Sequence, residues 1–116
     1  MTPVELLAGA RRLVNEPNEL TVGLWARAAA LLARQALEKS IRQSLYQEYK
    51  VTGRPTFRSQ LICLRALVDE ELAEEAAWTW TALSSATHVQ GYGMPPTAGE
   101  LTRWIASVER VVLRLG

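Results

Sequence analysis

The sequence is poor in the residues on which most small catalytic and metal sites depend. It contains a single cysteine, Cys63, and a single histidine, His88. One cysteine cannot form an internal disulfide, and one cysteine with one histidine cannot supply the four ligands of a usual structural zinc site. Because Cys63 lies in an apolar run, we expect it to be a small core side chain in a reducing, cytoplasmic setting. We therefore expect no metal site.

Two motifs that identify enzymes are also missing. The one Gly-x-Gly, at Gly91 and Gly93, follows no predicted strand, so it is not a dinucleotide-binding fingerprint. No serine stands in a nucleophile elbow, which argues against a serine hydrolase. The sequence thus gives no reason to expect a cofactor.

Strong charge and long apolar runs are absent as well. The formal net charge is +1, with 22% charged residues, so there is no overall basic excess of the kind that nucleic-acid readers carry. The most apolar stretch, residues 24–37, is too short and too interrupted by arginine to span a membrane. The N-terminus lacks the basic and apolar blocks of a signal peptide. At this length, we expect residues 1–116 to form one soluble domain.

What the sequence does have is one long segment without glycine or proline, from Leu24 to Tyr49. It is much longer than an average globular helix of about 11 to 12 residues. Its first half is apolar on almost every side, and a helix of that kind is buried by several neighbours. The segment therefore predicts the central helix of an α-helical bundle.

Capping and breaking residues divide the rest of the chain into further helices. Thr2-Pro3-Val4-Glu5 and Thr97-Ala98-Gly99-Glu100 are capping boxes that start the first and last helices. The first helix is expected over residues 3–14, and the second from near Thr21 to before Thr52. The third is expected to begin at Pro55, with Phe57, Leu61, Leu64 and Leu67 on one face. The fourth should run from Glu70 to Thr87 after the cap Asp69, and the last from Thr97 onward. Val89 to Pro96, with two Gly and two Pro, is expected to be a loop. The predicted fold is all-α, a compact bundle of four to five antiparallel helices.

The fourth predicted helix carries two faces. At 100° per residue, its core face holds Leu72, Ala76, Leu83 and Ala86, and a second stripe holds Ala77, Thr81, Ser84, Ser85 and His88. Trp78 lies nearer this small, polar stripe than the core. An aromatic among acids away from the core often marks a partner contact, although the ring can also pack under a neighbouring helix. His88 is either a solvent-facing end of the helix or part of a site or an interface.

Arginine greatly outnumbers lysine, which together with abundant alanine indicates a GC-rich bacterial genome. On the long helix, Arg34, Glu38 and Arg42 are spaced four apart, which predicts a ladder of ion pairs. Arg27 falls on nearly the same side as Arg34 among apolar positions. An arginine in that setting usually needs a carboxylate or an interface.

The long helix and the later part of the chain together resemble the HEPN superfamily (higher eukaryotes and prokaryotes nucleotide-binding). The resemblance covers roughly Leu24 to Val108 and rests on the helix Ala26 to Lys39, on Leu83-Ser84-Ser85-Ala86-Thr87-His88, and on Tyr92, Pro96-Thr97 and Glu100-Leu101. It implies a HEPN-like fold. Catalytic members carry an Arg, four to six residues, and then a His at a dimer interface that cleaves RNA. His88 matches the histidine, but Leu83, Ala82 and Thr81 stand where the arginine is expected.

Without that guanidinium, the charge that develops on a scissile phosphate loses its stabilising partner. We therefore expect a non-catalytic RNA- or protein-binding module, or a subunit of a bacterial defence or toxin–antitoxin system, acting as a homodimer or in a larger complex. Two alternatives stay open: a metal-independent ribonuclease that uses His88, and a purely structural subunit. The candidate site residues are His88 for catalysis and Trp78, Thr81, Ser84, Ser85, Tyr92, Arg27 and Arg34 for binding.

Overall fold

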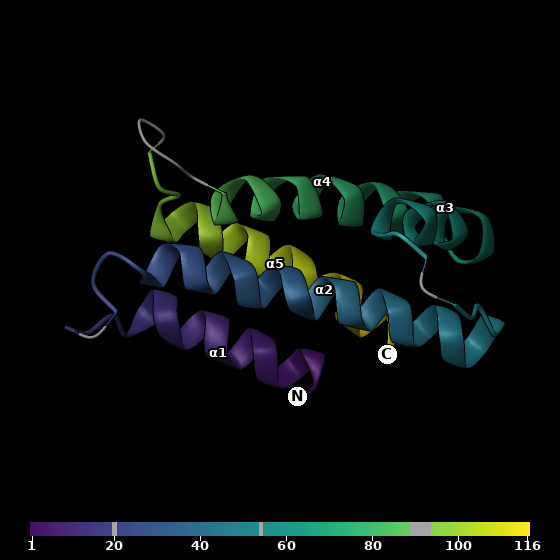
Figure 1. The fold of residues 1–116 in the computed structure, drawn as a ribbon, viewed down its shortest axis with the longest axis horizontal. Helices are drawn as coiled ribbons and strands as arrows, with labels where there is room; N and C mark the ends of the chain where they lie inside the picture. Colours follow the sequence, from purple (N-terminus) through teal and green to yellow (C-terminus); the bar gives the residue numbers. More distant parts are fainter. Residues whose placement is uncertain (20, 54, 89–93) are drawn as a thin grey trace.

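The chain is a bundle of α-helices. The computed structural model describes residues 1–19, 21–53, 55–88 and 94–116, and within these ranges it contains five helices and no strand. The helices are α1 (Pro3–Asn15), α2 (Trp25–Tyr49), α3 (Phe57–Leu67), α4 (Glu70–Thr87) and α5 (Ala98–Leu115). Four of them lie side by side along the long axis, and the shorter α3 packs beside α4 near one end (Figure 1). The all-α prediction is confirmed.

Local capping fixes the start of most helices. Both predicted capping boxes are present: Thr2 accepts a hydrogen bond from the backbone N–H of Glu5, and Thr97 accepts one from Glu100. Asp69 accepts from the N–H of Glu71 and so starts α4 at the predicted residue. Each cap satisfies a backbone donor that a helix end leaves without a partner. The carboxylates of these first turns also lie near the positive end of the helix dipole.

The long helix is central, as predicted, because α2 contacts each of the other four helices. It begins at Trp25 and not near Thr21. Gly23 has φ +81°, a conformation that a right-handed helix does not contain, and residues 21–24 form a turn before the helix. A series of alanines on α2 is fully buried: Ala29, Ala30, Ala33 and Ala36. Their small side chains let neighbouring helices approach α2 closely.

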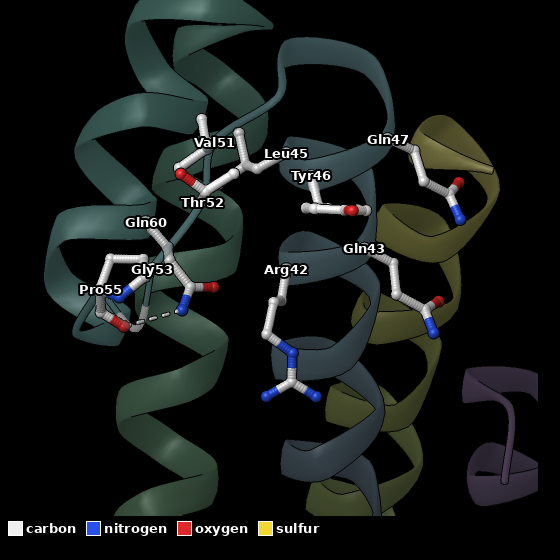
Figure 2. Close-up of a pocket in the computed structure, with 10 residues that line it drawn as sticks. All are labelled: Arg42, Gln43, Leu45, Tyr46, Gln47, Val51, Thr52, Gly53, Pro55 and Gln60. Atoms are coloured by element: carbon white, nitrogen blue, oxygen red, sulfur yellow. Dashed lines mark hydrogen bonds between the residues drawn. The ribbon is translucent and has the colours of Figure 1, made fainter.

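The other end of α2 turns sharply toward α3. Lys50 adopts a left-handed conformation (φ 56°, ψ 30°), and its N–H and that of Val51 bond to the carbonyls of Tyr46 and Leu45 at 3.1 Å each. The bond from Lys50 to Tyr46 is that of the αL motif, which closes a helix C-terminus and redirects the chain. After the turn, Val51 and Leu45 line the same cavity between α2 and α3 (Figure 2).

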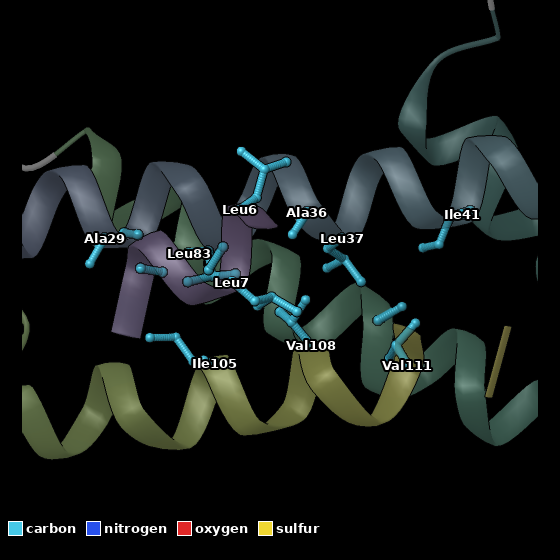
Figure 3. Packing of buried hydrophobic residues seen from close by; sticks show 14 of the residues in the cluster. Leu6, Leu7, Ala29, Ala36, Leu37, Ile41, Leu83, Ile105, Val108 and Val111 are labelled. Atoms are coloured by element: carbon cyan, nitrogen blue, oxygen red, sulfur yellow. The ribbon is translucent and has the colours of Figure 1, made fainter. Parts of the chain in front are cut away.

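The core lies where α1, α2, α4 and α5 face one another (Figure 3), and α3 contributes Leu64 to it. Its largest fully buried side chains include Leu37, Ile41, Leu45, Leu64, Leu83, Leu101, Ile105, Val108 and Val111. The radius of gyration is 14.4 Å, close to the roughly 13 Å expected for a compact chain of this length. Among the described residues, no helix is long and apolar enough to cross a membrane.

The third helix differs from its prediction. It starts at Phe57 after the cap Thr56, and not at Pro55, and Leu67 is exposed while Gln60 is buried. The ring of Phe57 stacks on Trp80 of α4 with centroids 5.0 Å apart, which rotates the inner face of α3 toward Gln60 and Leu64. Cys63 is only partly buried against the core.

Candidate functional site

Four of the predicted site residues form one exposed stripe along α4. Trp78, Thr81, Ser85 and His88 are all exposed, and their spacing of three, four and three residues keeps them on one side of the helix. Trp78 is 68% exposed, so the ring does not pack under a neighbouring helix. We call these four residues the α4 stripe.

The Trp78 end of the stripe borders a groove between α4 and α5. The groove has a volume of about 580 Å³ and is lined by Trp78 and Ala82 on one side and by Arg103 and Trp104 on the other. It continues past Ser85 to Met94, Pro95 and Pro96. An ion pair between Arg110 and Glu75, at 2.9 Å, crosses the groove. Tryptophan and arginine are the residues most enriched at protein-binding hot spots.

Charge is distributed unevenly along the outer face of α4. Glu70, Glu71 and Glu74 are exposed at its beginning, whereas His88 lies at its end. Glu70 pairs with Arg65 of α3, and the carboxylate of Glu74 has no ion pair in the described part of the chain. The outer face is thus acidic at one end and has no acid at the other.

Arg27 and Arg34 meet at the C-terminal end of α4. Arg27 Nε donates to the backbone carbonyl of Thr87 at 2.8 Å, and Arg34 Nη1 donates to the Thr87 hydroxyl at 3.2 Å. A helix C-terminus presents carbonyls without helical partners and carries partial negative charge, so both cations are well placed. The sequence placed Arg27 among apolar positions, where an arginine needs a carboxylate or an interface; its side chain is exposed, and its partner within the described residues is a backbone carbonyl.

These two arginines therefore stand beside the residue that precedes His88. The Thr87 hydroxyl also donates to the carbonyl of Ser84 at 2.8 Å, which ties Arg34 to the last turn of α4. The Ser84 hydroxyl is buried and forms no hydrogen bond with the described residues, so Ser84 belongs to this inner cluster and not to the exposed stripe. Tyr92 lies outside the described residues.

The predicted ion-pair ladder on α2 forms only in part. Arg34 Nε lies 3.4 Å from Glu38 Oε1, close enough for an ion pair but without hydrogen-bond geometry. Arg42 makes no ion pair within the described ranges. Its side chain lines a different cavity, between α2 and α3.

The described residues contain no group of three or more His, Cys, Asp or Glu side chains placed to hold a metal ion. The imidazole of His88 is exposed and forms no hydrogen bond to another described side chain. Its backbone N–H closes α4 by donating to the carbonyl of Ser85 at 3.2 Å. No described carboxylate therefore orients the ring, which is the usual support of a catalytic or metal-binding histidine.

Two features of the structure were not predicted from the sequence. Trp104 lines the groove opposite Trp78, because it lies at the edge of the buried face of α5. Gln60 was not selected, although a glutamine among the apolar positions of α3 is the kind of signal that marks a buried polar group. Both depend on how neighbouring helices rotate against each other.

No family model matches the chain, and no curated protein or solved structure is significantly similar to it. The resemblance to HEPN proteins consequently stands on the sequence patterns alone.

Proposed function

We propose that this chain is a non-catalytic binding module that pairs through the α4 stripe with a second copy of itself. The observation that carries the proposal is the 68% exposure of Trp78, which lies on the outer face of α4 between exposed carboxylates and the small, polar residues of the stripe. Exposed tryptophans of this kind contribute strongly to binding when a partner covers them. The antiparallel arrangement of the helices, predicted from the sequence pattern, belongs to the same proposal. The HEPN-like fold and a role in bacterial defence or a toxin–antitoxin system belong to it as implications of the resemblance.

Charge favours a second copy as the partner. In a twofold dimer the same patch meets itself, so an isologous surface must be complementary to itself. If two α4 helices cross near Trp78 and Thr81 in opposite directions, Glu74 of one copy faces the His88 end of the other, where Arg27 also lies. Opposite charges then lie across the interface at both ends.

The same charges favour protein over RNA as the occupant of this face. Glu70, Glu71 and Glu74 lie exposed along the first half of α4. A phosphate backbone approaching that half would meet carboxylates, whereas RNA affinity depends on neutralising phosphates with Lys and Arg. Binding of RNA to this face is therefore an outcome that would contradict the proposal.

Sedimentation and light scattering test the pairing. We expect the protein to have twice the chain mass of 12.9 kDa, and Trp78→Ala to raise the dimer dissociation constant by about thirtyfold, the effect of a typical hot spot. Glu74→Lys should weaken the dimer as well, because it places the new lysine near Arg27 of the other copy.

Ile62→Ala is the matched control, since Ile62 is 64% exposed on α3, away from the stripe. A monomer, or a dimer equally insensitive to Trp78→Ala and Ile62→Ala, would reject this interface.

A ribonuclease is the second candidate, favoured by the position of Arg27 and Arg34 beside Thr87. In such a reaction the 2′-oxygen attacks the phosphorus as it loses its proton, the bond to the 5′-oxygen breaks, and that oxygen takes up a proton. His88 would move the protons and one guanidinium would stabilise the charged phosphate. Against this role, both guanidinium groups already donate to Thr87.

End-labelled structured and single-stranded RNA separates the two candidates. Cleavage by the native protein that disappears in His88→Ala, with the dimer intact, would establish the enzyme. A binding module leaves both RNAs uncut by either protein.

A further inference from the structure

The cavity between the end of α2 and the start of α3 has the features of a small-molecule site. Its volume is about 290 Å³, and it lies on the opposite side of α2 from α1, away from the α4 stripe (Figure 2). Leu45, Val51 and Pro55 supply apolar walls, and the phenol of Tyr46, 58% exposed, lies at its edge. An apolar cavity with a few polar groups is the usual form of a ligand pocket.

One polar atom in this cavity lacks a partner. Gln60 is only 8% exposed, and its Nε2 donates to the carbonyl of Pro55 at 3.2 Å. This bond fixes the orientation of the amide, because the oxygen cannot face another carbonyl. Gln60 Oε1 is buried and accepts no hydrogen bond from a described residue. Figure 2 shows this oxygen on the side of Gln60 that faces α2. A buried acceptor left without a donor is costly, so a ligand N–H at this point gains a full hydrogen bond.

Of the described residues, one cation faces the cavity from the other side. Arg42 projects from α2 on the side toward α3, whereas Gln43 and Gln47 point away from it (Figure 2). Its guanidinium makes no ion pair within the described residues. Among the described side chains that line the cavity, Arg42 is the charged one, and its guanidinium can pair with one negative charge of a ligand. A carboxylate suits this better than a phosphate dianion, and its two oxygens match the fork of a guanidinium.

We propose that this cavity binds a small planar heterocycle that carries an N–H donor and a carboxylate. The N–H meets Gln60 Oε1, the ring lies against Leu45, Val51 and Tyr46, and the carboxylate pairs with Arg42. The left-handed turn at Lys50 preorganises the pocket, since it holds Val51 against the end of α2 before any ligand arrives. The inference is independent of the dimer proposal, because it uses none of the residues of the α4 stripe.

Three related probes test each contact separately: indole-3-acetate, 1-methylindole-3-acetate without the N–H, and 3-methylindole without the carboxylate. Two-dimensional NMR of the ¹⁵N-labelled full chain reports the backbone amides of Val51 and Gly53 and the side-chain amide of Gln60. Indole-3-acetate should shift these signals saturably. Each altered probe should bind at least about fivefold more weakly, as expected for loss of one buried hydrogen bond or charged pair.

The variants then link each probe to one residue. In Gln60→Met, N-methylation should change the affinity by no more than about twofold, because the acceptor is gone. In Arg42→Gln, removal of the carboxylate should likewise have no effect. Arg42 is exposed, so this second variant remains informative if Gln60→Met fails to fold. Gln47→Ala is the matched control on the rim and should bind all three probes as the native protein does.

Several results would overturn the proposal. These are the absence of saturable shifts with indole-3-acetate, shifts centred away from Val51 and Gln60, and equal affinity for the three probes. Equal losses for every probe in Gln60→Met and Arg42→Gln would also overturn it, because they would reflect a general disturbance of the pocket.

Discussion

Single residues in unusual environments mark the places where this chain departs from simple packing rules. Gln60 is polar in a buried position, Trp78 is apolar in an exposed one, and Lys50 holds a left-handed backbone. The first two are the bases of the proposed ligand and dimer sites. Lys50 is different, because its conformation serves the chain turn that ends α2. A side chain in this region clashes with its own backbone, and glycine avoids the clash.

We predict that Lys50→Gly raises the free energy of unfolding by about 0.5–1 kcal/mol, because relief of the left-handed strain outweighs the added freedom of the unfolded chain. Lys50 also donates from Nζ to the carbonyl of Gln47 at 3.1 Å, an exposed bond whose loss costs little. Urea denaturation measures the change.

Lys50→Ala separates the two contributions. It keeps the strain and loses the same exposed bond, so it should be no more stable than the native protein. If Lys50→Gly were no more stable than Lys50→Ala, the backbone conformation at this position would not be the source of the strain.

At the scale of elements, the helices were largely readable from the sequence. Helix starts were predictable where a side chain itself caps the backbone, as at Thr2, Asp69 and Thr97. These signals are local, since the cap and the amide it satisfies lie two or three residues apart. The late start of α2 was missed because Gly23 and the residues around it form a turn by backbone conformation, which helical periodicity does not reveal.

The rotation of each helix was less predictable than its extent. Periodicity placed Leu72, Ala76 and Leu83 correctly on the core face of α4. On α3, the stack of Phe57 on Trp80 decides which side faces inward, and that contact joins residues 23 positions apart.

The candidate site, like the helices, was predicted only in part. Its exposed stripe followed from spacing within α4, whereas the placement of Arg27 and Arg34 at Thr87 required knowledge of how α2 lies against α4.

At the scale of the whole molecule, a few long-range polar contacts join helices that are distant in the sequence. Arg11 of α1 and Glu109 of α5 form a bidentate ion pair. Arg11 Nε donates to Glu109 Oε2 at 2.9 Å, and Arg11 Nη2 donates to Glu109 Oε1. Inside the bundle, the hydroxyls of Thr79 and Ser107 lie 2.7 Å apart and connect α4 to α5. None of these pairings could be predicted from the sequence, because each side chain has many possible partners and only the packing of the helices decides which one it meets.

The Arg11–Glu109 pair should make stability depend on pH. The hydrogen bond from Arg11 holds the pKa of Glu109 below its ordinary value, although partial burial acts in the opposite direction. A carboxyl with a lowered pKa in the fold adds stability above its unfolded pKa of about 4.3. That stability is lost as the pH falls through the folded pKa. Both side chains are more than a third exposed, so solvent screens much of the attraction.

We predict that Glu109→Gln lowers the free energy of unfolding by about 0.5–1 kcal/mol at neutral pH, the upper part of the range for exposed ion pairs. The difference in the free energy of unfolding between Glu109→Gln and the native protein should shrink toward zero once the pH is below the range in which carboxylates titrate. Glu109 is then neutral in both the folded and the unfolded state. Urea denaturation across this pH range measures it. Glu48→Gln is the control, since Glu48 is exposed on α2 without an ion pair among the described residues, and its difference should stay small throughout. A loss in Glu109→Gln that persisted undiminished in acid would show that packing at this position, and not the charge, joins the first and last helices.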